Sequence, residues 1–158
     1  MPETEITAEP GGSQIVITRE FDAPRELVFR CFTDPDLIPR WLGPRELAMR
    51  VDEFDLKDGG RYRYVNIDAE GTEYRFRGVF HGTPTPDLMV QTFEFEGMPG
   101  HVALEALTMT EQDGRTLVRT RSSFQSVEDR DGIIASGMER GVRDANERLA
   151  ELLTEITS

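Results

Sequence analysis

Few residues in this chain of 158 could carry catalysis, because it has one cysteine and two histidines. Nucleophilic catalysis requires a cysteine or serine within reach of a histidine and an orienting acid. Cys31 shares the apolar face of a predicted helix, which indicates a small buried side chain. His81 falls on the charged face of a predicted strand and His101 follows a Pro-Gly turn, so both are expected at the surface. We predict no catalytic residue and favour a binding protein over an enzyme.

Metal and phosphate sites are not indicated either. A zinc site needs several His or Cys ligands at suitable spacing, and here these residues are scattered over different predicted elements. The glycines of "GMERG" lie inside a predicted helix and do not follow a strand, so they form no phosphate loop. We therefore expect no metal and no cofactor. Among the carboxylates, Glu105 could face inward because its strand, "HVALEALTM", is apolar at both parities, but a solvated position is the favoured interpretation.

The better candidates for a binding site are aromatic. Between residues 47 and 125, six runs of alternating side chains are separated by turn sequences such as "DGG" and "QDG", which predicts an antiparallel meander. The alternation places aromatic side chains on one face and charged side chains on the other. A tyrosine on that face offers a ligand both an apolar ring and a hydroxyl. The candidate ligand-binding residues are Trp41, Tyr62, Tyr64, Phe76, Phe80, Phe93, Phe95, Met138 and Gly141.

A long helix is predicted from about residue 132 to residue 156, because apolar residues recur there at spacings of three and four. Gly137 and Gly141 lie in its N-terminal half, where they leave room either for close backbone approach or for a cavity. A strand over 15–21 and two short helices precede the meander. The predicted fold is α+β: a curved antiparallel sheet of about seven strands wrapped around the long C-terminal helix.

Composition sets the remaining expectations. Residues 1–13 are acidic and rich in Pro and Gly, which predicts a flexible tail before a single domain over 14–158. The formal net charge of −12 repels phosphate backbones, so nucleic acid is a poor partner. No apolar stretch approaches the ~20 residues needed to span a bilayer. We therefore expect no membrane insertion. Since one cysteine cannot form an internal disulfide, we expect a cytoplasmic protein.

Three separated motifs then indicate a family. They are "FDAPRELVFRCFTDPDLIPRWLGP", "DGGRYRY" followed by "GTEYRFRGVF", and "FQSVEDRDGIIASGMERGVRDANERLAELL". In this order they resemble the START-like, or helix-grip, superfamily, and within it the family of homologues of the activator of heat shock protein 90 ATPase. One departure is Leu42, where the family often has a second tryptophan before Gly-Pro.

The resemblance implies a deep, mostly apolar cavity between the long helix and the sheet, and it shifts the interpretation of Gly137 and Gly141 towards that cavity. It implies binding of a hydrophobic small molecule or lipid. Two alternatives stay open: an enzyme of the polyketide cyclase or hydrolase kind, and a chaperone-linked interaction module with a protein partner.

Overall fold

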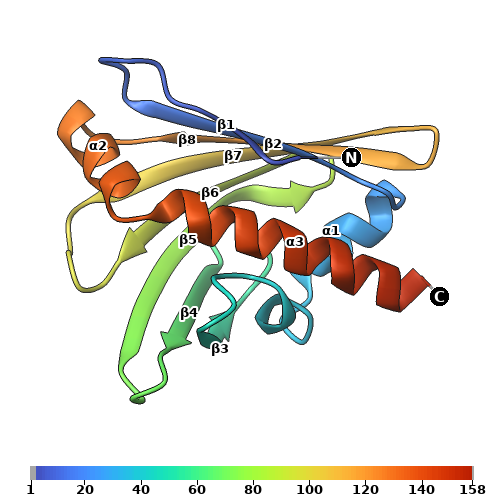
Figure 1. Ribbon diagram of the computed structural model, residues 1–158, viewed down its shortest axis with the longest axis horizontal. Helices are drawn as coiled ribbons and strands as arrows, with labels where there is room; N and C mark the ends of the chain where they lie inside the picture. The colour runs from blue at the N-terminus through green and yellow to red at the C-terminus, as the bar shows by residue number, and fades with distance from the viewer. Residues whose placement is uncertain (1–2, 158) are drawn as a thin grey trace.

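The computed structural model describes residues 3–157. An antiparallel sheet of eight strands, in the order β1-β2-β8-β7-β6-β5-β4-β3, is crossed on one face by the helix α3 (Figure 1). In chain order the elements are β1 (Glu5–Thr7), β2 (Gln14–Phe21), α1 (Arg25–Thr33), the 3-10 helix η1 (Ile38–Arg40), β3 (Ala48–Phe54), β4 (Arg61–Ile67), β5 (Glu73–Thr85), β6 (Leu88–Phe95), β7 (Val102–Gln112), β8 (Arg115–Ser123), α2 (Val127–Ala135) and α3 (Met138–Thr157). This confirms the α+β helix-grip architecture.

The eighth strand lies in the N-terminal segment. The sequence predicts a flexible tail over residues 1–13, whereas the structure pairs β1 antiparallel with β2, with Ile6 opposite Ile17. The preceding Thr4 is held by α3: its carbonyl accepts from Arg143 Nη1 at 2.6 Å, and its Oγ1 accepts from Asn146 Nδ2 at 3.0 Å. Composition does not reveal this pairing or these hydrogen bonds. They show that the prediction of a flexible tail is wrong for residues 4–7.

The predicted C-terminal helix is divided in two. Ser136 N donates to the carbonyls of Gly132 and Ile133, and Gly137 follows with a φ of 89°. That left-handed conformation ends a helix at low cost only for glycine. Gly137 is therefore the residue that ends α2, and the helical spacing of apolar residues continues across the break without a continuous helix. Ser126 begins α2 by accepting a hydrogen bond from Asp129 N at 3.0 Å.

The apolar stripe of α3 is packed along its C-terminal half. Ala145, Leu149, Leu152 and Leu153 are buried there against α1 and the inner faces of β7 and β8. Burying one such leucine contributes ~1.5–3 kcal/mol, so this end of the helix is firmly attached. A second core cluster lies under η1 and consists of Ile38, Tyr62, Tyr64, Phe80 and Met89. Residues 138–144 of α3 lie outside both clusters.

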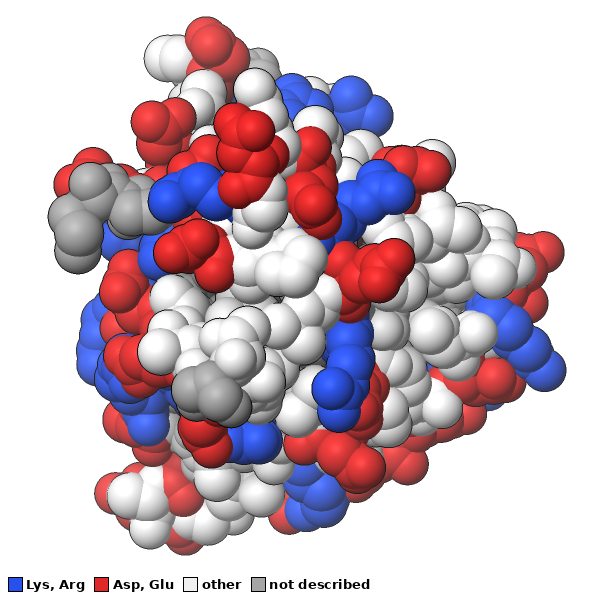
Figure 2. Space-filling view, turned by 90° about the vertical axis from the view of Figure 1, so that its right-hand side faces the viewer, with Lys and Arg blue, Asp and Glu red and all other residues white. Residues whose placement is uncertain are grey.

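The outer face of the sheet is charged, as the strand alternation predicts. Cross-strand ion pairs cover β4 to β6, including Arg63 with Glu96 at 2.6 Å and Arg77 with Glu94 at 3.0 Å. Acidic and basic side chains are also interspersed on the side of the molecule that Figure 2 shows, which is the right-hand side of Figure 1. Within residues 3–157 no helix combines the length and the apolar character needed to cross a membrane.

Candidate functional site

A cavity of about 380 Å³ lies between the inner face of the sheet and the N-terminal half of α3. Side chains from α1, β2 to β8, the η1 region and the two C-terminal helices line it, and most of them are apolar. The packed C-terminal half of α3 closes one end, while small side chains of α3 leave the space open at the other. The sequence therefore builds a hollow in the interior by placing small residues on one half of a helix stripe.

Seven of the nine predicted ligand-binding residues line this cavity. They are Trp41, Tyr62, Tyr64, Phe76, Phe93, Met138 and Gly141. Phe80 is buried on the same face of the sheet but does not border the cavity, and its ring centroid lies 5.5 Å from that of Tyr62. Phe95 lies beyond the lining and packs on Phe76 at 5.1 Å. Both belong to the aromatic interior without bordering the space.

Gly141 does not serve close packing against a strand. A Cβ placed on it would meet the Pro44 side chain at 3.6 Å, which is an ordinary van der Waals distance. The sequence leaves close backbone approach and a cavity open as alternatives for this glycine. Because its nearest neighbour is a loop side chain and Gly141 itself borders the space, the geometry matches the cavity alternative.

Glu105 faces the cavity, which corrects the favoured prediction of a solvated position. In the register of the sheet it lies opposite Gln91 of β6 and Ser122 of β8. Gln91 Nε2 donates to its Oε1 at 3.1 Å, and Ser122 Oγ donates to its Oε2 at 3.4 Å. The sequence did not show that Glu105 points inward, because Leu104, on the outer face of β7, is apolar yet 47% exposed.

Burial raises the pKa of the Glu105 carboxyl above its ordinary value, and the hydrogen bonds from Gln91 and Ser122 offset only part of this. Burial also raises the pKa of the Tyr62 and Tyr64 hydroxyls, with the nearby Glu105 charge as a further cause. Both phenols are therefore neutral across the physiological range. The cavity therefore holds a carboxyl with a raised pKa beside two neutral tyrosines.

The raised pKa predicts a pH-dependent stability. Since the folded protein holds the Glu105 proton more tightly than the unfolded chain, the free energy of unfolding falls as pH rises from about 4.5 through the raised pKa. The slope is at most ~1.4 kcal/mol per pH unit. Glu105→Gln should flatten this slope in urea unfolding measured from pH 4.5 to 8. An unchanged slope in the variant would show that Glu105 does not titrate differently on folding.

Arg19 is a second polar residue that sequence reasoning did not select. Its strand parity matches that of Ile15 and Phe21, so the pattern contained the signal. The side chain is 7% exposed, borders the cavity, and pairs with Glu147 of α3 at 3.3 Å. Its guanidinium also lies 5.0 Å from the centre of the Phe21 ring. Arg19 thus brings a positive charge to the cavity wall that α3 already neutralises.

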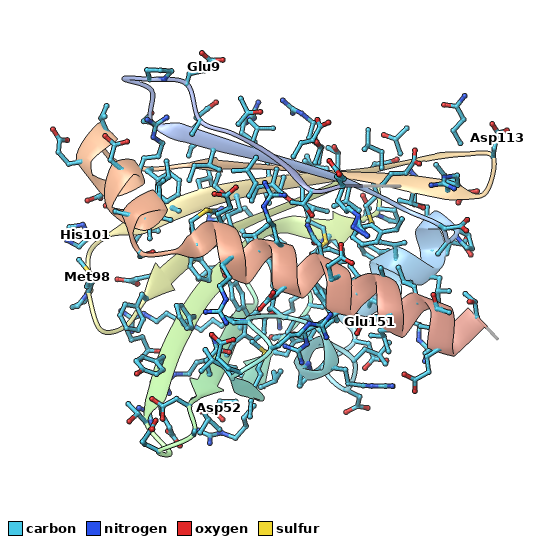
Figure 3. All side chains as sticks on the ribbon, in the orientation of Figure 1. Glu9, Asp52, Met98, His101, Asp113 and Glu151 are labelled. Carbon is cyan, nitrogen blue, oxygen red and sulfur yellow. The ribbon has the colours of Figure 1, made fainter. Side chains whose placement is uncertain are left out.

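The remaining candidates for chemistry lie elsewhere. His101 is exposed in the β6–β7 loop beside Met98 (Figure 3), where its Nδ1 lies 2.9 Å from Asp129 Oδ1. His81 is exposed on the outer face. Cys31 is buried, and burial raises the pKa of its thiol to about 11, which suppresses the reactive thiolate. Among the described residues, no group of three or more His, Cys, Asp or Glu could hold a metal ion.

These features, a grip-like sheet around α3 and an apolar cavity between them, coincide with a family match. Residues 22–154 match the family described as Activator of Hsp90 ATPase homolog 1-like protein. The chain belongs to this family. Membership in the Activator of Hsp90 ATPase homolog 1-like family confirms the resemblance carried by the three sequence motifs. Comparison with curated protein sequences gives no match.

Solved structures share this Activator of Hsp90 ATPase homolog 1-like fold. A protein from Rhodobacter sphaeroides is 25% identical with a TM-score of 0.88, over 97% of this chain and 99% of that chain. A protein from Arthrobacter aurescens is 25% identical with a TM-score of 0.88, over 96% of this chain and 91% of that chain. CalU16 from Micromonospora echinospora is 20% identical with a TM-score of 0.60, over 99% of this chain and 89% of that chain, and shows likeness of fold alone.

Proposed function

We propose that this protein binds a hydrophobic small molecule or lipid in the cavity between α3 and the sheet. The observation that carries the proposal is the cavity itself, about 380 Å³ of space inside a mostly apolar and aromatic wall. Interiors normally pack without voids larger than a water molecule, so a hollow of this size is unfavourable unless something occupies it. The START-like fold to which the family belongs commonly binds hydrophobic ligands, which supports the same function.

The aromatic wall favours a ligand with a flat or bulky apolar body. Phe76 and Phe93 lie nearly parallel, with centroids 5.4 Å apart and planes 17° from each other, and both border the space. Tyr62 and Tyr64 form another close pair at 4.7 Å. Ring faces and edges of this kind bury apolar ligand area at ~25 cal/mol per Å² and add stacking energy with an aromatic ligand.

The other two candidate functions have weaker support. An enzyme of the polyketide cyclase or hydrolase kind would use Glu105 for proton transfer. The aliphatic hydroxyls that line the cavity are those of Thr120 and Ser122, and neither His81 nor His101 lines it to activate them. For an interaction module a contiguous apolar patch is expected. The exposed large apolar side chains instead belong to α2, four different strands and one loop.

The proposal predicts that 1-ethylnaphthalene and 1-decanol, used as apolar probes, raise the melting temperature in a concentration-dependent way. Binding to the native state alone stabilises by ~2.7 kcal/mol when the free probe is at 100 times its Kd, which corresponds to roughly 5–10 °C for a domain of this size. Differential scanning calorimetry measures the shift. No shift with either probe up to its solubility would contradict the binding function.

A cavity-filling variant shows where the probes bind. Gly141→Leu places a side chain at the border of the space and should reduce the shift at least by half. Gly132→Leu is the matched control, because this glycine lies in α2 with open space around its Cβ and does not border the cavity. A control variant that loses as much of the shift as Gly141→Leu would place the probes outside the cavity.

A further inference from the structure

A polar row one residue wide crosses the apolar floor of the cavity. It consists of Ser122, Glu105 and Gln91, which lie side by side on β8, β7 and β6 and are joined by hydrogen bonds. Along the strands the row is bordered by Leu107 on one side and Phe93 on the other, and both line the same space. A ligand lying on this floor therefore meets one carboxyl, that of Glu105, while other polar side chains of the lining, such as Thr120, Asn66 and Asn146, carry only neutral hydroxyl or amide groups.

No charged group compensates a negative charge at the centre of this row. The two groups bonded to Glu105 are a neutral amide and a neutral hydroxyl. Arg19, which reaches the cavity from β2, is engaged by Glu147 of α3. The side chains that α3 contributes to the wall are uncharged, and they are Met138, Gly141, Val142, Ala145 and Asn146. An isolated carboxylate in such surroundings is costly, so the carboxylic acid is the favoured form.

The titratable groups of β4 that face the row are Tyr62 and Tyr64, and they differ in availability. Tyr62 Oη donates to the Thr92 carbonyl at 2.5 Å. The Tyr64 hydroxyl has no hydrogen-bond partner within residues 3–157, although its side chain is buried at the cavity wall. The O–H groups of Glu105 and Tyr64 are thus two donors that a ligand can use, because a neutral carboxylic acid carries one O–H of its own.

These donors select the chemistry of the ligand's polar group. A carbonyl oxygen has two lone pairs and no charge, so it can accept from the cavity without bringing an ion into it. A ligand carboxylate would carry an uncompensated charge into apolar surroundings, and an ammonium group would require Glu105 to ionise there. The ketosteroid isomerase site illustrates the principle, since a carboxylic acid held neutral by apolar surroundings donates a hydrogen bond to a ligand oxygen.

We propose that Glu105 determines the specificity of this cavity, as a neutral carboxylic acid that donates a hydrogen bond to the carbonyl oxygen of an uncharged, mainly aromatic ligand. The proposal rests on the proposed binding function and adds the class of ligand: aromatic ketones and related carbonyl compounds, in preference to fatty acids and amines.

Four naphthalene probes of similar size test the proposal by isothermal titration calorimetry at pH 6: 1-acetylnaphthalene, 1-ethylnaphthalene, 1-naphthoate and 1-naphthylmethylamine. One hydrogen bond to a buried donor corresponds to a preference of about tenfold for the ketone over the ethyl compound. The naphthoate and the amine should each bind at least tenfold more weakly than the ketone.

Two variants separate hydrogen bonding from charge. Glu105→Gln keeps an N–H donor at the same place and should retain the preference for ketone over ethyl within threefold. Glu105→Leu removes the donor and should reduce that preference to about one. Glu53→Gln, on the exposed side of β3, is the matched control and should behave as the wild type. The ketone affinity of the wild type should also fall as pH rises through the raised pKa of Glu105, and that of Glu105→Gln should not.

Each other outcome overturns the proposal in a recognisable way. Tightest binding of the amine, lost in Glu105→Gln, would show an ionised Glu105 that recognises a cation. Equal binding of ketone and ethyl compounds to the wild type would show that Glu105 does not touch the ligand, while the proposed hydrophobic binding would stand. Failure of all four probes to bind, as of the apolar probes above, would overturn both proposals together.

Discussion

Gly78→Ala is expected to destabilise the protein by about 3 kcal/mol or more, because there is no space for a Cβ at this position in β5. The added atom would approach the Thr92 carbonyl oxygen to 2.0 Å and the Tyr62 ring to 2.4 Å. Gly78 lies opposite Tyr62 in the sheet register, and the tyrosine ring covers it. Overpacking ordinarily costs ~1–3 kcal/mol, and a clash with backbone belongs at or above the upper end.

The same substitution would disturb the cavity. With its ring displaced, Tyr62 would lose the hydrogen bond from its hydroxyl to the Thr92 carbonyl, leaving buried polar groups without partners. Urea unfolding followed by circular dichroism measures the change. Gly132→Ala is the control, because its Cβ meets open space in α2, and its stability should equal or slightly exceed that of the wild type. A free energy of unfolding for Gly78→Ala within 1 kcal/mol of wild type would contradict the argument.

The layers of the fold could be predicted because their signals are local. Alternation along each strand places Tyr62 and Tyr64 on one face and Arg61 and Arg63 on the other, whatever the rest of the chain does. Short turn sequences then require antiparallel neighbours. The apolar stripe of the last helix needs a cover, and a sheet with one aromatic face provides it. These steps use only the period of the pattern and the length of each connection.

Which of the inward side chains border the cavity could not be predicted in the same way. Strand parity tells which face of the sheet a side chain occupies, but not whether it borders the cavity or packs against other core side chains. Phe76 and Phe80 share a face of β5, yet Phe76 lines the cavity and Phe80 is packed between Tyr62 and Phe54. The difference depends on where η1 and α3 lie over the sheet, which is a property of the whole fold.

Glu105 and Gly137 show how two local signals can mislead. β7 has apolar residues on both faces, so its sequence does not show which face is the inner one. The inward position of Glu105 is set by its pairing with Gln91 and Ser122 on the adjacent strands. Gly137 lies within a run of helical spacing, but it takes a positive φ because Met138 begins a new helix in a new direction. In both cases pairing or packing between distant segments decided the outcome.

Trp41→Ala is expected to cost ~3–5 kcal/mol in the free energy of unfolding, the range found when a large buried aromatic side chain is removed. Trp41 is 4% exposed, and its ring centroid lies 4.7 Å from that of Phe32. Its indole N–H also donates to the Cys31 carbonyl at 2.9 Å. That carbonyl belongs to the last turn of α1, where the residue four positions on is Pro35, which has no N–H to offer.

Trp41→Phe separates the two contributions of this residue. Phenylalanine keeps an aromatic ring against Phe32 but leaves the Cys31 carbonyl without its donor, so it should cost roughly 1–3 kcal/mol, less than the alanine variant. Urea unfolding of both variants at pH 7 gives the comparison. Because Trp41 also borders the cavity, the alanine variant enlarges the space and should weaken the binding of 1-ethylnaphthalene through lost ring contacts. Equal costs for the two variants would show that the hydrogen bond accounts for the stability that Trp41 provides. A cost below 1 kcal/mol for Trp41→Ala would show that Trp41 borders the cavity but does not stabilise α1.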